Sequence, residues 1–590
     1  MKNLWQTLSK LFRVLPFGAR KFFVGYSLIT GALALLDIVA LGLVLLTVNA
    51  LAAGHAVSLP LLGDLPESMT VWVAVAVGVL FIVKGVLAIG LHWVATRKFA
   101  SYELTVGDRI FDRYMRSDWA RRSQMSTAEV TRLVDTAMAN TTMGFLVPLS
   151  QVPVNALTFV GALSVLVVSQ PLTALTAFLY LGAVSTLMFF VITPQARRAG
   201  DHNRKFSYLV ATLITEMIDA LKEVTLRGKL DDVGATISRN RRRATRARAN
   251  VAFLSAVPKY VFEAALIGGF LVVGGVAYLV GGPEGLVTGL TLFAATGFRM
   301  MPAMNSVQAS ITQASSNSVY ANDIVNELQF PLRESVEIAR DESSLPSNPT
   351  VLKLSEVSFS YPGSSTKVLD GLNLEIPIGS SLALVGPSGA GKSTLIDILL
   401  GLSMASGGTV ELDGMPLESV ISQWRSRVGY VPQRVALFDA SIAQNVALTW
   451  NDDFDSSKVE EVLERVNLSD LLDREAGIYR ALGERGATVS GGQQQRIGIA
   501  RALYSDPFVM VMDEATSALD TATEKVVTDS LNELRGSVTF ITVAHRLSTI
   551  RNYDQVCYLD SGKILAKGTF DEVVAELPEF EAQARLAGLT

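Results

Sequence analysis

The chain has 590 residues, more than one hydrophobic core usually organises, so its length excludes a single small binding module and predicts a multidomain or membrane protein. Apolar residues make up 49% of the chain and charged residues 18%, below the roughly 25% of an average soluble domain. The net charge of −4 offers no positive field for nucleic acid, and one cysteine with four histidines excludes a disulfide framework and a cysteine-based zinc site.

The N-terminal half is predicted to lie in a membrane. Residues 1–21 are basic and amphipathic, which indicates an interfacial helix. The apolar run that follows is too long for a signal peptide and has no convincing cleavage site. Six runs exceed the roughly 20 residues that a bilayer needs: 22–53, 70–96, 138–169, 172–194, 251–281 and 285–311. The sequence therefore predicts an all-α six-helix transmembrane domain over residues 22–312.

The basic residues between these spans set the expected orientation. The connection 97–136 holds eight Lys and Arg and the connection 196–250 holds thirteen, whereas the three opposite connections hold none. By the positive-inside rule both termini and the two long connections are cytoplasmic. Helical spacing in these connections predicts that the membrane helices continue into the cytosol. Their turns, residues 117–125 and 216–226, are the expected contacts with a cytosolic domain.

Five ionisable residues fall within the expected spans: Asp37, Lys84, Lys259, Glu263 and Arg299. A charge at membrane depth costs several kcal/mol, so it usually faces a polar cavity or a partner. Arg299 lies fourteen residues after the outer start of the sixth span, which at 1.5 Å per residue is roughly 21 Å deep. Its guanidinium can bind a phosphate bidentately, or it can form an ion pair with Glu263 or Asp37 that only holds helices together. The sequence favours neither role.

The C-terminal half has the pattern of a soluble α/β domain. Residues 313–350 are polar, acidic and end in a Ser/Pro-rich patch, which predicts a linker. From 351 to 590, short β-rich runs alternate with helical ones. A buried strand at 381–385 leads into Gly386-Pro387-Ser388-Gly389-Ala390-Gly391-Lys392-Ser393-Thr394 and then a helical run. This is the G-x-x-x-x-G-K-[ST] P-loop in its required strand–loop–helix setting.

These residue types suit the phosphates of a nucleotide. Glycines let the backbone approach closely, so that N–H groups and the helix N-terminus surround the phosphates. Lys392 is expected to reach the β- and γ-phosphates, and the Ser393 hydroxyl to bind Mg²⁺. A second apolar strand ends at Asp513, followed by Glu514. Beside a P-loop, Asp513 is expected to orient the Mg²⁺ shell and Glu514 to act as general base on water.

The run Val489-Ser490-Gly491-Gly492-Gln493 resembles the signature motif of ABC transporters, with Val489 in place of the usual Leu. The whole chain is similar to an ABC exporter half-transporter of the type IV, or type I exporter, fold. This resemblance implies that Tyr361 stacks on adenine, that Gln433 contacts Mg²⁺ and water, and that His545 contacts the γ-phosphate. It also implies a D-loop at 517–520 and an exporter X-loop at 483–486.

The resemblance to ABC exporters further implies a dimer that uses ATP and Mg²⁺. In that family ATP lies between the P-loop of one copy and the signature, here Ser490, Gly491, Gly492 and Gln493, of the other. One chain with one cassette therefore needs a second copy, and since its motifs are intact both sites of a homodimer are expected to hydrolyse ATP. The expected location is the cytoplasmic (inner) membrane, with the nucleotide-binding domain in the cytoplasm and no nucleic acid partner.

Two short segments bear on the substrate. Residues 258–263 and 298–305 are similar to segments of lipid-linked oligosaccharide flippases of the PglK type. There the arginine of the F-R-x-x-P stretch is thought to engage the lipid's pyrophosphate, and Arg299 stands at the matching place. The resemblance implies ATP-driven flipping of a polyprenyl-pyrophosphate-linked oligosaccharide. A multidrug or lipid exporter, which shares every cassette motif, is the alternative.

Overall fold

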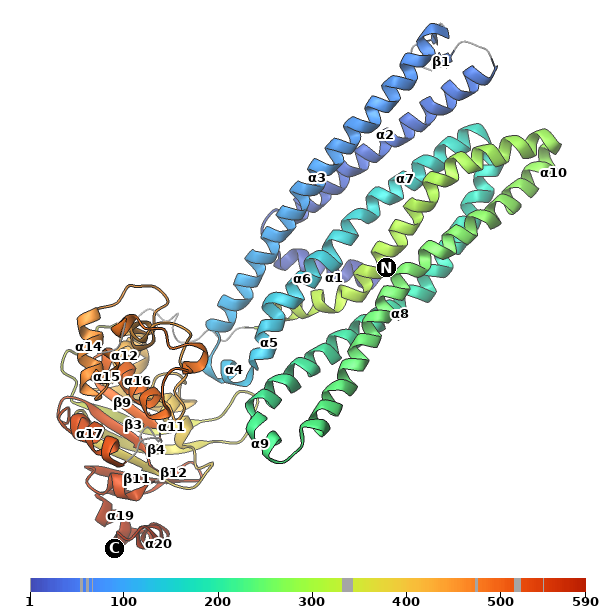
Figure 1. Cartoon of the computed structure of the whole chain (residues 1–590). Helices are drawn as coiled ribbons and strands as arrows, with labels where there is room; N and C mark the ends of the chain where they lie inside the picture. Colours follow the sequence, from blue (N-terminus) through green and yellow to red (C-terminus); the bar gives the residue numbers. More distant parts are fainter. Residues whose placement is uncertain are drawn as a thin grey trace. The chain divides into compact units, whose positions relative to one another are not determined.

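The computed structural model describes the backbone of residues 2–53, 57–59, 63–65, 67–331, 343–472, 476–513, 521–544 and 546–589. The chain divides into two compact units (Figure 1). A helical unit comprises Met1–Met115 and Met125–Pro331. A second unit comprises Arg116–Gln124 and Leu332–Thr590 and contains the strands of the α/β domain.

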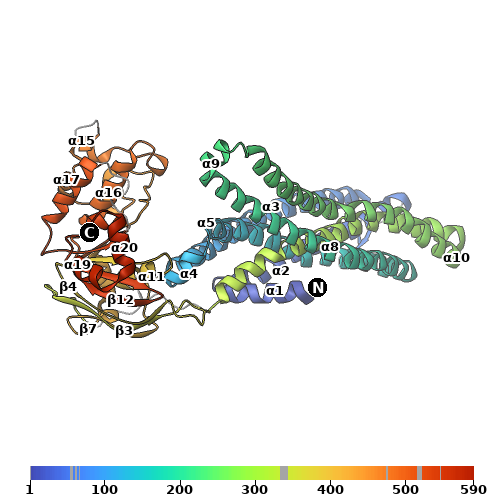
Figure 2. The same cartoon turned by 90° about the horizontal axis from the view of Figure 1, so that it is seen from below.

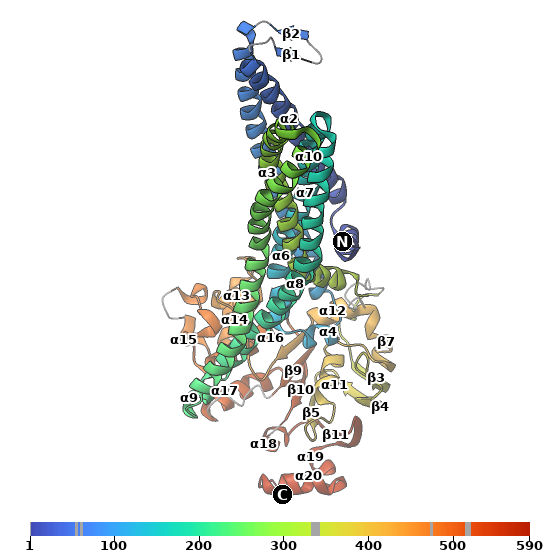
Figure 3. The same ribbon diagram turned by 90° about the vertical axis from the view of Figure 1, so that its right-hand side faces the viewer.

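Long helices build the first unit. They are α1 (Lys2–Val14), α2 (Ala19–Ala53), α3 (Glu67–Met115), α7 (Val147–Ser169), α8 (Pro171–Asp219) and α10 (Leu230–Gln329). An antiparallel hairpin, β1 (Val57–Leu59) with β2 (Gly63–Leu65), lies at the tip of α2 and α3 (Figure 3). Short turns complete the unit: α5 (Thr127–Thr131), η1 (Arg132–Ala137), α6 (Met138–Thr141), η2 (Thr142–Leu146) and α9 (Leu221–Leu226).

Among the described residues, five helices are long and apolar enough to cross a membrane. The last of them, α10, has 100 residues and reverses direction at Gly282, the one residue inside it with non-helical angles (φ 60°, ψ −152°). Glycine adopts such a positive φ without a steric penalty. Two of the expected spans, 251–281 and 285–311, are therefore the two arms of α10, which packs along α8 (Figure 2).

The helices extend well beyond a bilayer. α3 and α8 have 49 residues each, which is about 74 Å of helix against about 40–45 Å for a membrane with its head groups. The predicted continuation of the membrane helices beyond the bilayer is confirmed, and the side on which they emerge stays a prediction. The structure differs from the expected linker, because residues 313–329 are the end of α10. The stretch is rich in Gln, Asn, Asp and Glu, yet small residues such as Ala314, Ser315 and Ser318 are buried where helices pack closely.

The second unit holds two sheets. A four-stranded antiparallel sheet has the order β4 (Leu369–Pro377), β3 (Val351–Phe359), β6 (Gly407–Leu412), β7 (Met415–Pro416). A six-stranded sheet has the order β12 (Lys563–Gly568), β11 (Gln555–Asp560), β5 (Ser381–Val385), β10 (Thr539–Val543), β9 (Val509–Asp513), β8 (Val428–Val431). Its strands from β11 to β8 are parallel, and β12 is antiparallel to β11.

Helices cover these sheets in the second unit. They are α4 (Trp119–Gln124), α11 (Lys392–Leu399), α12 (Ile421–Ser426), α13 (Ile442–Ala447), α14 (Ser456–Arg465), α15 (Ser469–Leu472), α16 (Gly491–Tyr504), α17 (Thr521–Asn532), α18 (Leu547–Ile550), α19 (Phe570–Glu576) and α20 (Pro578–Leu586). One apolar cluster joins both sheets to α11, and a second joins α13, α14 and α16 to β8 and β9. The P-loop helix and the signature helix α16 thus belong to different cores.

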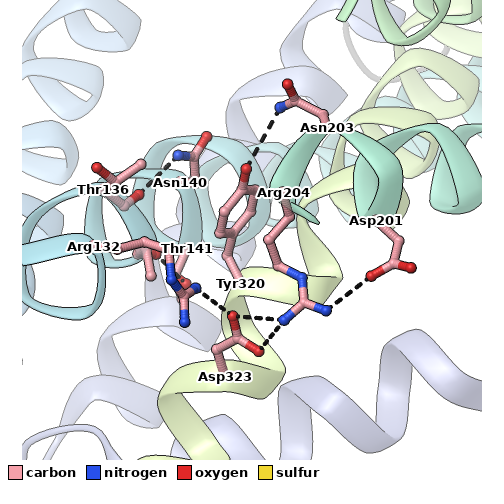
Figure 4. A network of polar contacts seen from close by, with 10 residues as sticks. Arg132, Thr136, Asn140, Thr141, Asp201, Asn203, Arg204, Tyr320 and Asp323 are labelled. Carbon is pink, nitrogen blue, oxygen red and sulfur yellow. Dashed lines mark hydrogen bonds and ion pairs between the residues drawn. The ribbon is translucent and has the colours of Figure 1, made fainter. Parts of the chain in front are cut away.

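An ion network joins three segments of the helical unit (Figure 4). Asp323 of α10 accepts from Arg132 of η1 at 2.6 Å and from Arg204 of α8 at 2.8 Å. Arg204 also binds Asp201 at 3.0 Å, and Asn203 donates to the Tyr320 hydroxyl at 3.5 Å. The Asp323 side chain is only 16% exposed, so this carboxylate is a shared counter-charge for two guanidinium groups in partly desolvated surroundings.

Replacing Asp323 by Ala should destabilise the helical unit by about 3 kcal/mol, because two partly buried arginines lose their common counter-charge. Asp232→Ala is the matched control. It removes the partner of Lys229 in a pair whose side chains are 64% and 69% exposed, and such a pair contributes less than ~1 kcal/mol. Thermal unfolding of the purified full chain in detergent measures both. Equal effects of the two variants would contradict a stabilising role of the network.

Candidate nucleotide site and membrane cavity

The parallel sheet gathers the nucleotide-site residues at one edge. β10 lies between β5 and β9, and the register places Leu384, Val543 and Asp513 level with one another. The P-loop that follows β5 and the carboxylate that ends β9 are therefore at the same carboxyl edge, where doubly wound folds bind ligands. Glu514 directly follows β9, while His545 is the second residue after β10; both, with the D-loop 517–520, lie outside the described residues and stay predictions.

Two P-loop glycines are required by the backbone path. Gly386 has φ 143°, and a Cβ added there would lie 1.9 Å from the carbonyl oxygen of Leu559. Gly391 has φ 103° and caps α11, and a Cβ there would meet the carbonyl oxygen of Val368 at 3.0 Å. The loop therefore packs its backbone directly on neighbouring backbone, which only glycine permits, and Ser388, Gly389 and Ser393 stay exposed.

Lys392 is held over this loop. Its Nζ donates to the carbonyl oxygens of Gly386 and Pro387, both at 2.8 Å, which uses two of its three N–H groups. Burial lowers the pKa of Lys392, and the nearby Asp513 carboxylate opposes that shift. A cation so placed, with a carboxylate across the sheet edge, suits Mg²⁺-bound phosphates.

The remaining predicted nucleotide contacts are distributed over the second unit. The Tyr361 hydroxyl lies 3.1 Å from Thr394 Oγ1, so the aromatic residue expected at adenine touches the P-loop helix. Ser490 caps α16, accepting from the Gln493 N–H at 3.2 Å, while Gln493 Oε1 accepts from the Ser490 N–H at 3.0 Å. This capping box leaves an exposed helix N-terminus at the signature. Gln433, two residues after β8, is also exposed.

The P-loop helix also contacts α4, and this was not visible in the sequence. The Trp119 indole N–H donates to the Asp397 carboxylate on α11, and burial raises the pKa of Asp397 to about 6. Since Arg116–Gln124 belongs to the second unit, the expectation that the turn 117–125 contacts the cytosolic domain is confirmed. The other turn, 216–226, is part of the helical unit.

A cavity of about 560 Å³ lies in the helical unit among α2, α3, α7 and α10. Among the described residues it is lined by Tyr26, Thr30, Leu33, Ala34, Lys84, Ala88, His92, Gln151, Val154, Asn155, Thr158, Phe298, Arg299, Pro302, Ala303 and Ser306. This lining holds three basic side chains and no carboxylate. Two polar residues in the third apolar run, Gln151 and Asn155, were the overlooked sequence signal for it.

Arg299 is half-buried in this lining, with its guanidinium carbon 5.4 Å from the centre of the Phe81 ring. A guanidinium over an aromatic face is stabilised electrostatically. Glu263, one of its two expected ion-pair partners, is exposed and does not line the cavity. The side chain of the other, Asp37, lies outside the described residues. Lys259 is exposed and lies 5.8 Å from the Tyr260 ring centre.

Part of the chain matches a family model, and the fold of the whole chain resembles a solved structure. Residues 369–517 match the family model described as ABC transporter. Over the full length, the structure is similar to a solved bacterial Atm1-family ABC exporter with ATP bound, with a TM-score of 0.76, 22% identity, and coverage of 97% of this chain and 99% of that one. The predicted fold is confirmed: a helical unit with helices long enough to cross a membrane is fused to an α/β domain that contains the match to the ABC transporter family.

Curated relatives match over a shorter stretch. The ATP-dependent lipid A-core flippase of Pectobacterium atrosepticum is 38% identical over 226 residues, and that of Salmonella typhimurium is 37% identical over 227. The flippase of Vibrio vulnificus is 36% identical over 225 residues. Each alignment spans 38% of this chain and 39% of the relative. These relatives are lipid A-core flippases, so the resemblance to PglK-type flippases stays a prediction.

Gly386→Ala should lower the ATPase rate at least roughly 100-fold, because the new methyl group displaces the P-loop from Leu559 and a shift of about 1 Å in a site costs on the order of 10²-fold. The control is Gly414→Ala, which also has a positive φ (79°) but meets nothing within 4 Å. It should cost only the backbone strain, about 1–2 kcal/mol of stability. Equal ATPase rates per folded molecule in the two variants would refute the close-packing argument.

Asp397 should make the stability of the chain pH-dependent. Its pKa rises from 3.8 to about 6 on folding, so the stabilisation is present below pH 3.8 and is lost as the pH rises through about 6. Asp397→Asn should remove this part of the pH dependence of thermal unfolding. Trp119→Phe removes the donor to the ionised carboxylate, so it should extend the loss above pH 6. Unfolding profiles of Asp397→Asn that parallel the wild type would be the contrary result.

Proposed function

We propose that the chain is one half of a homodimeric exporter that uses ATP to move a phosphate-bearing lipid from the inner to the outer leaflet of the cytoplasmic membrane. The observation that carries this proposal is the cavity that presents Lys84, His92 and Arg299 together with apolar side chains. Phosphate is the anion that arginine and lysine bind in such settings. Apolar lining residues suit the lipid part of the same molecule.

The depth of the cavity agrees with a lipid head group from the inner leaflet. Arg299 lies fourteen residues from Gly285 at the outer side, roughly 21 Å, and Lys84 lies seventeen residues from Glu67, roughly 26 Å. Tyr26 is only seven residues from the cytoplasmic start of α2, roughly 11 Å. The lining thus reaches from mid-membrane toward the cytoplasmic side, where a lipid enters before it is flipped.

The nucleotide site supplies the free energy in this proposal. The P-loop backbone and Lys392 hold the phosphates, Asp513 orients the Mg²⁺ shell, and Glu514 takes a proton from the attacking water while His545 contacts the γ-phosphate. The signature of the second copy completes the site, so ATP closes two cassettes on each other. The Trp119–Asp397 contact supports transmission of this closure, since it joins α4 to the helix that holds the P-loop.

The finer proposal is that the lipid is a polyprenyl-pyrophosphate-linked oligosaccharide. It is supported by Arg299, the arginine of the F-R-x-x-P stretch, in the cavity lining. The lipid A-core flippases among the relatives favour a second candidate, a phosphorylated saccharolipid. Both put phosphate on an apolar anchor. A multidrug exporter is favoured less, because the described lining offers cationic compounds no carboxylate.

Arg299→Gln and Lys84→Gln should each slow flipping of a polyprenyl-pyrophosphate glycan in proteoliposomes by about 10- to 100-fold, since hydrogen bonds between charged groups contribute roughly 1.5–3 kcal/mol. Lys259→Gln, which changes an exposed lysine outside the cavity, should leave flipping intact. Glu514→Gln should bind ATP and fail to flip. Stimulation of the ATPase by lipid A alone would select the second candidate, and unaltered flipping in Arg299→Gln would overturn the cavity assignment.

A further inference from the structure

A second cavity, of about 430 Å³, lies among α1, α8 and α10 and shares no lining residue with the first. Among the described residues its lining is Asn3, Leu4, Thr7, Phe189, Phe190, Thr193, Pro194, Arg197, Arg198, Ser315 and Ser318. Two arginines, two phenylalanines and several small polar groups therefore meet at one place, and none of these lining residues is acidic.

The position of this cavity along α8 matches the inner surface of a bilayer. Phe189 and Phe190 lie eighteen and nineteen residues after Pro171, roughly 27–29 Å from the outer end of the helix. Arg197 and Arg198 lie at roughly 39–41 Å. The hydrocarbon core is about 30 Å thick and the membrane with its head groups about 40–45 Å. The two rings are thus at the level of acyl chains and the two arginines at the level of head groups.

The first helix places the cavity at the same surface. Leu8 and Leu11 of α1 are buried in the helical unit, whereas Trp5 is 71% exposed on the same short helix. An exposed tryptophan on an amphipathic helix is typical of the membrane interface. Because α1 is packed on the protein by its leucines, its N-terminal residues form a fixed wall of the cavity.

One polar group in this cavity is buried without a partner. Thr193 is 9% exposed, and its Oγ1 has no hydrogen-bond partner among the described residues. Its carbonyl oxygen, in contrast, accepts from Ser315 Oγ at 3.3 Å. A buried hydroxyl without a partner costs roughly 1–3 kcal/mol, so such a group usually has a partner from a water, an ion or a ligand.

We propose that this cavity binds one anionic glycerophospholipid of the inner leaflet, separate from the lipid that is transported. The phosphate lies between Arg197 and Arg198 and accepts a hydrogen bond from the Thr193 hydroxyl. An acyl chain lies along Phe190, whose side chain is 71% exposed. A bound lipid would thereby join α1 to α8 and α10 at the cytoplasmic surface of the membrane.

The test is a titration of the delipidated full chain in detergent with phosphatidylglycerol, with bound lipid counted by native mass spectrometry. We expect one lipid per chain. The double variant Arg197→Gln/Arg198→Gln should bind about 30-fold more weakly, since each basic residue near the head groups contributes about 1 kcal/mol. Thr193→Val, which keeps the shape of the side chain, should bind about 10-fold more weakly. The matched control Arg241→Gln/Arg242→Gln removes two arginines from α10 outside this cavity and should bind normally.

Three further arms identify the ligand. Diacylglycerol, which lacks the phosphate, should not bind, and inorganic phosphate should not displace phosphatidylglycerol. Arg299→Gln should retain the lipid. Normal binding by the Arg197→Gln/Arg198→Gln variant would overturn the proposal, as would equal binding of diacylglycerol. Displacement by inorganic phosphate would instead indicate a free-anion site, and loss of the lipid in Arg299→Gln would place it in the first cavity; either result would also refute the proposal.

Discussion

A polypeptide that crosses hydrocarbon finds no water for its backbone, so each N–H and C=O has to be bonded within the segment. The helical unit meets most of this constraint with long helices, although Pro153 in α7 and Pro194 in α8 have no N–H and each leaves one carbonyl without its helical bond. α3 and α8 run on beyond the thickness of a bilayer without a break. α3 therefore joins its residues beyond the bilayer directly to Lys84, which lines the cavity that contains Arg299.

Ion pairs also connect the helices of this unit. Three segments are joined by the ion pairs of Asp323 with Arg132 and Arg204. These side chains are partly hydrated, which lowers the desolvation cost of the ion pairs. In the second unit, Trp119 binds Asp397 on the helix that begins with Lys392. The contact between α4 and α11, the helix that follows the P-loop, is thus direct and includes one hydrogen bond.

Motifs whose chemistry is local could be read from the sequence. The P-loop was predictable because Gly386 and Lys392 act within one strand–loop–helix unit. The level placement of Asp513 depends on β10 lying between β5 and β9, which is a property of the sheet order and not of any one segment. Trp119 and Asp397 are far apart in the chain, and no local sequence pattern around either residue predicts their hydrogen bond.

Average hydropathy also failed at one boundary for a physical reason. Residues 313–329 look like a polar linker, yet Ser315 and Ser318 are buried inside the bundle. Serine hydroxyls in a helix bond back to carbonyls of their own chain, as Ser318 Oγ does to the Ser315 carbonyl at 2.7 Å, so burial costs little. Small side chains then let the helices approach closely. Average hydropathy measures polarity and not packing, so it wrongly predicts that these residues are exposed to solvent.

The two cationic sites differ in what their position costs, and this difference bears on their roles. Arg197 and Arg198 lie at head-group depth, where a guanidinium stays hydrated and its placement requires no compensation. Arg299 lies near mid-membrane, where an arginine costs at least about 2.5 kcal/mol. The Phe81 ring offsets about 0.5–2 kcal/mol of this. Arg299 also shares its cavity with Lys84, and two basic side chains in one lining are the arrangement that the proposed phosphate binding uses.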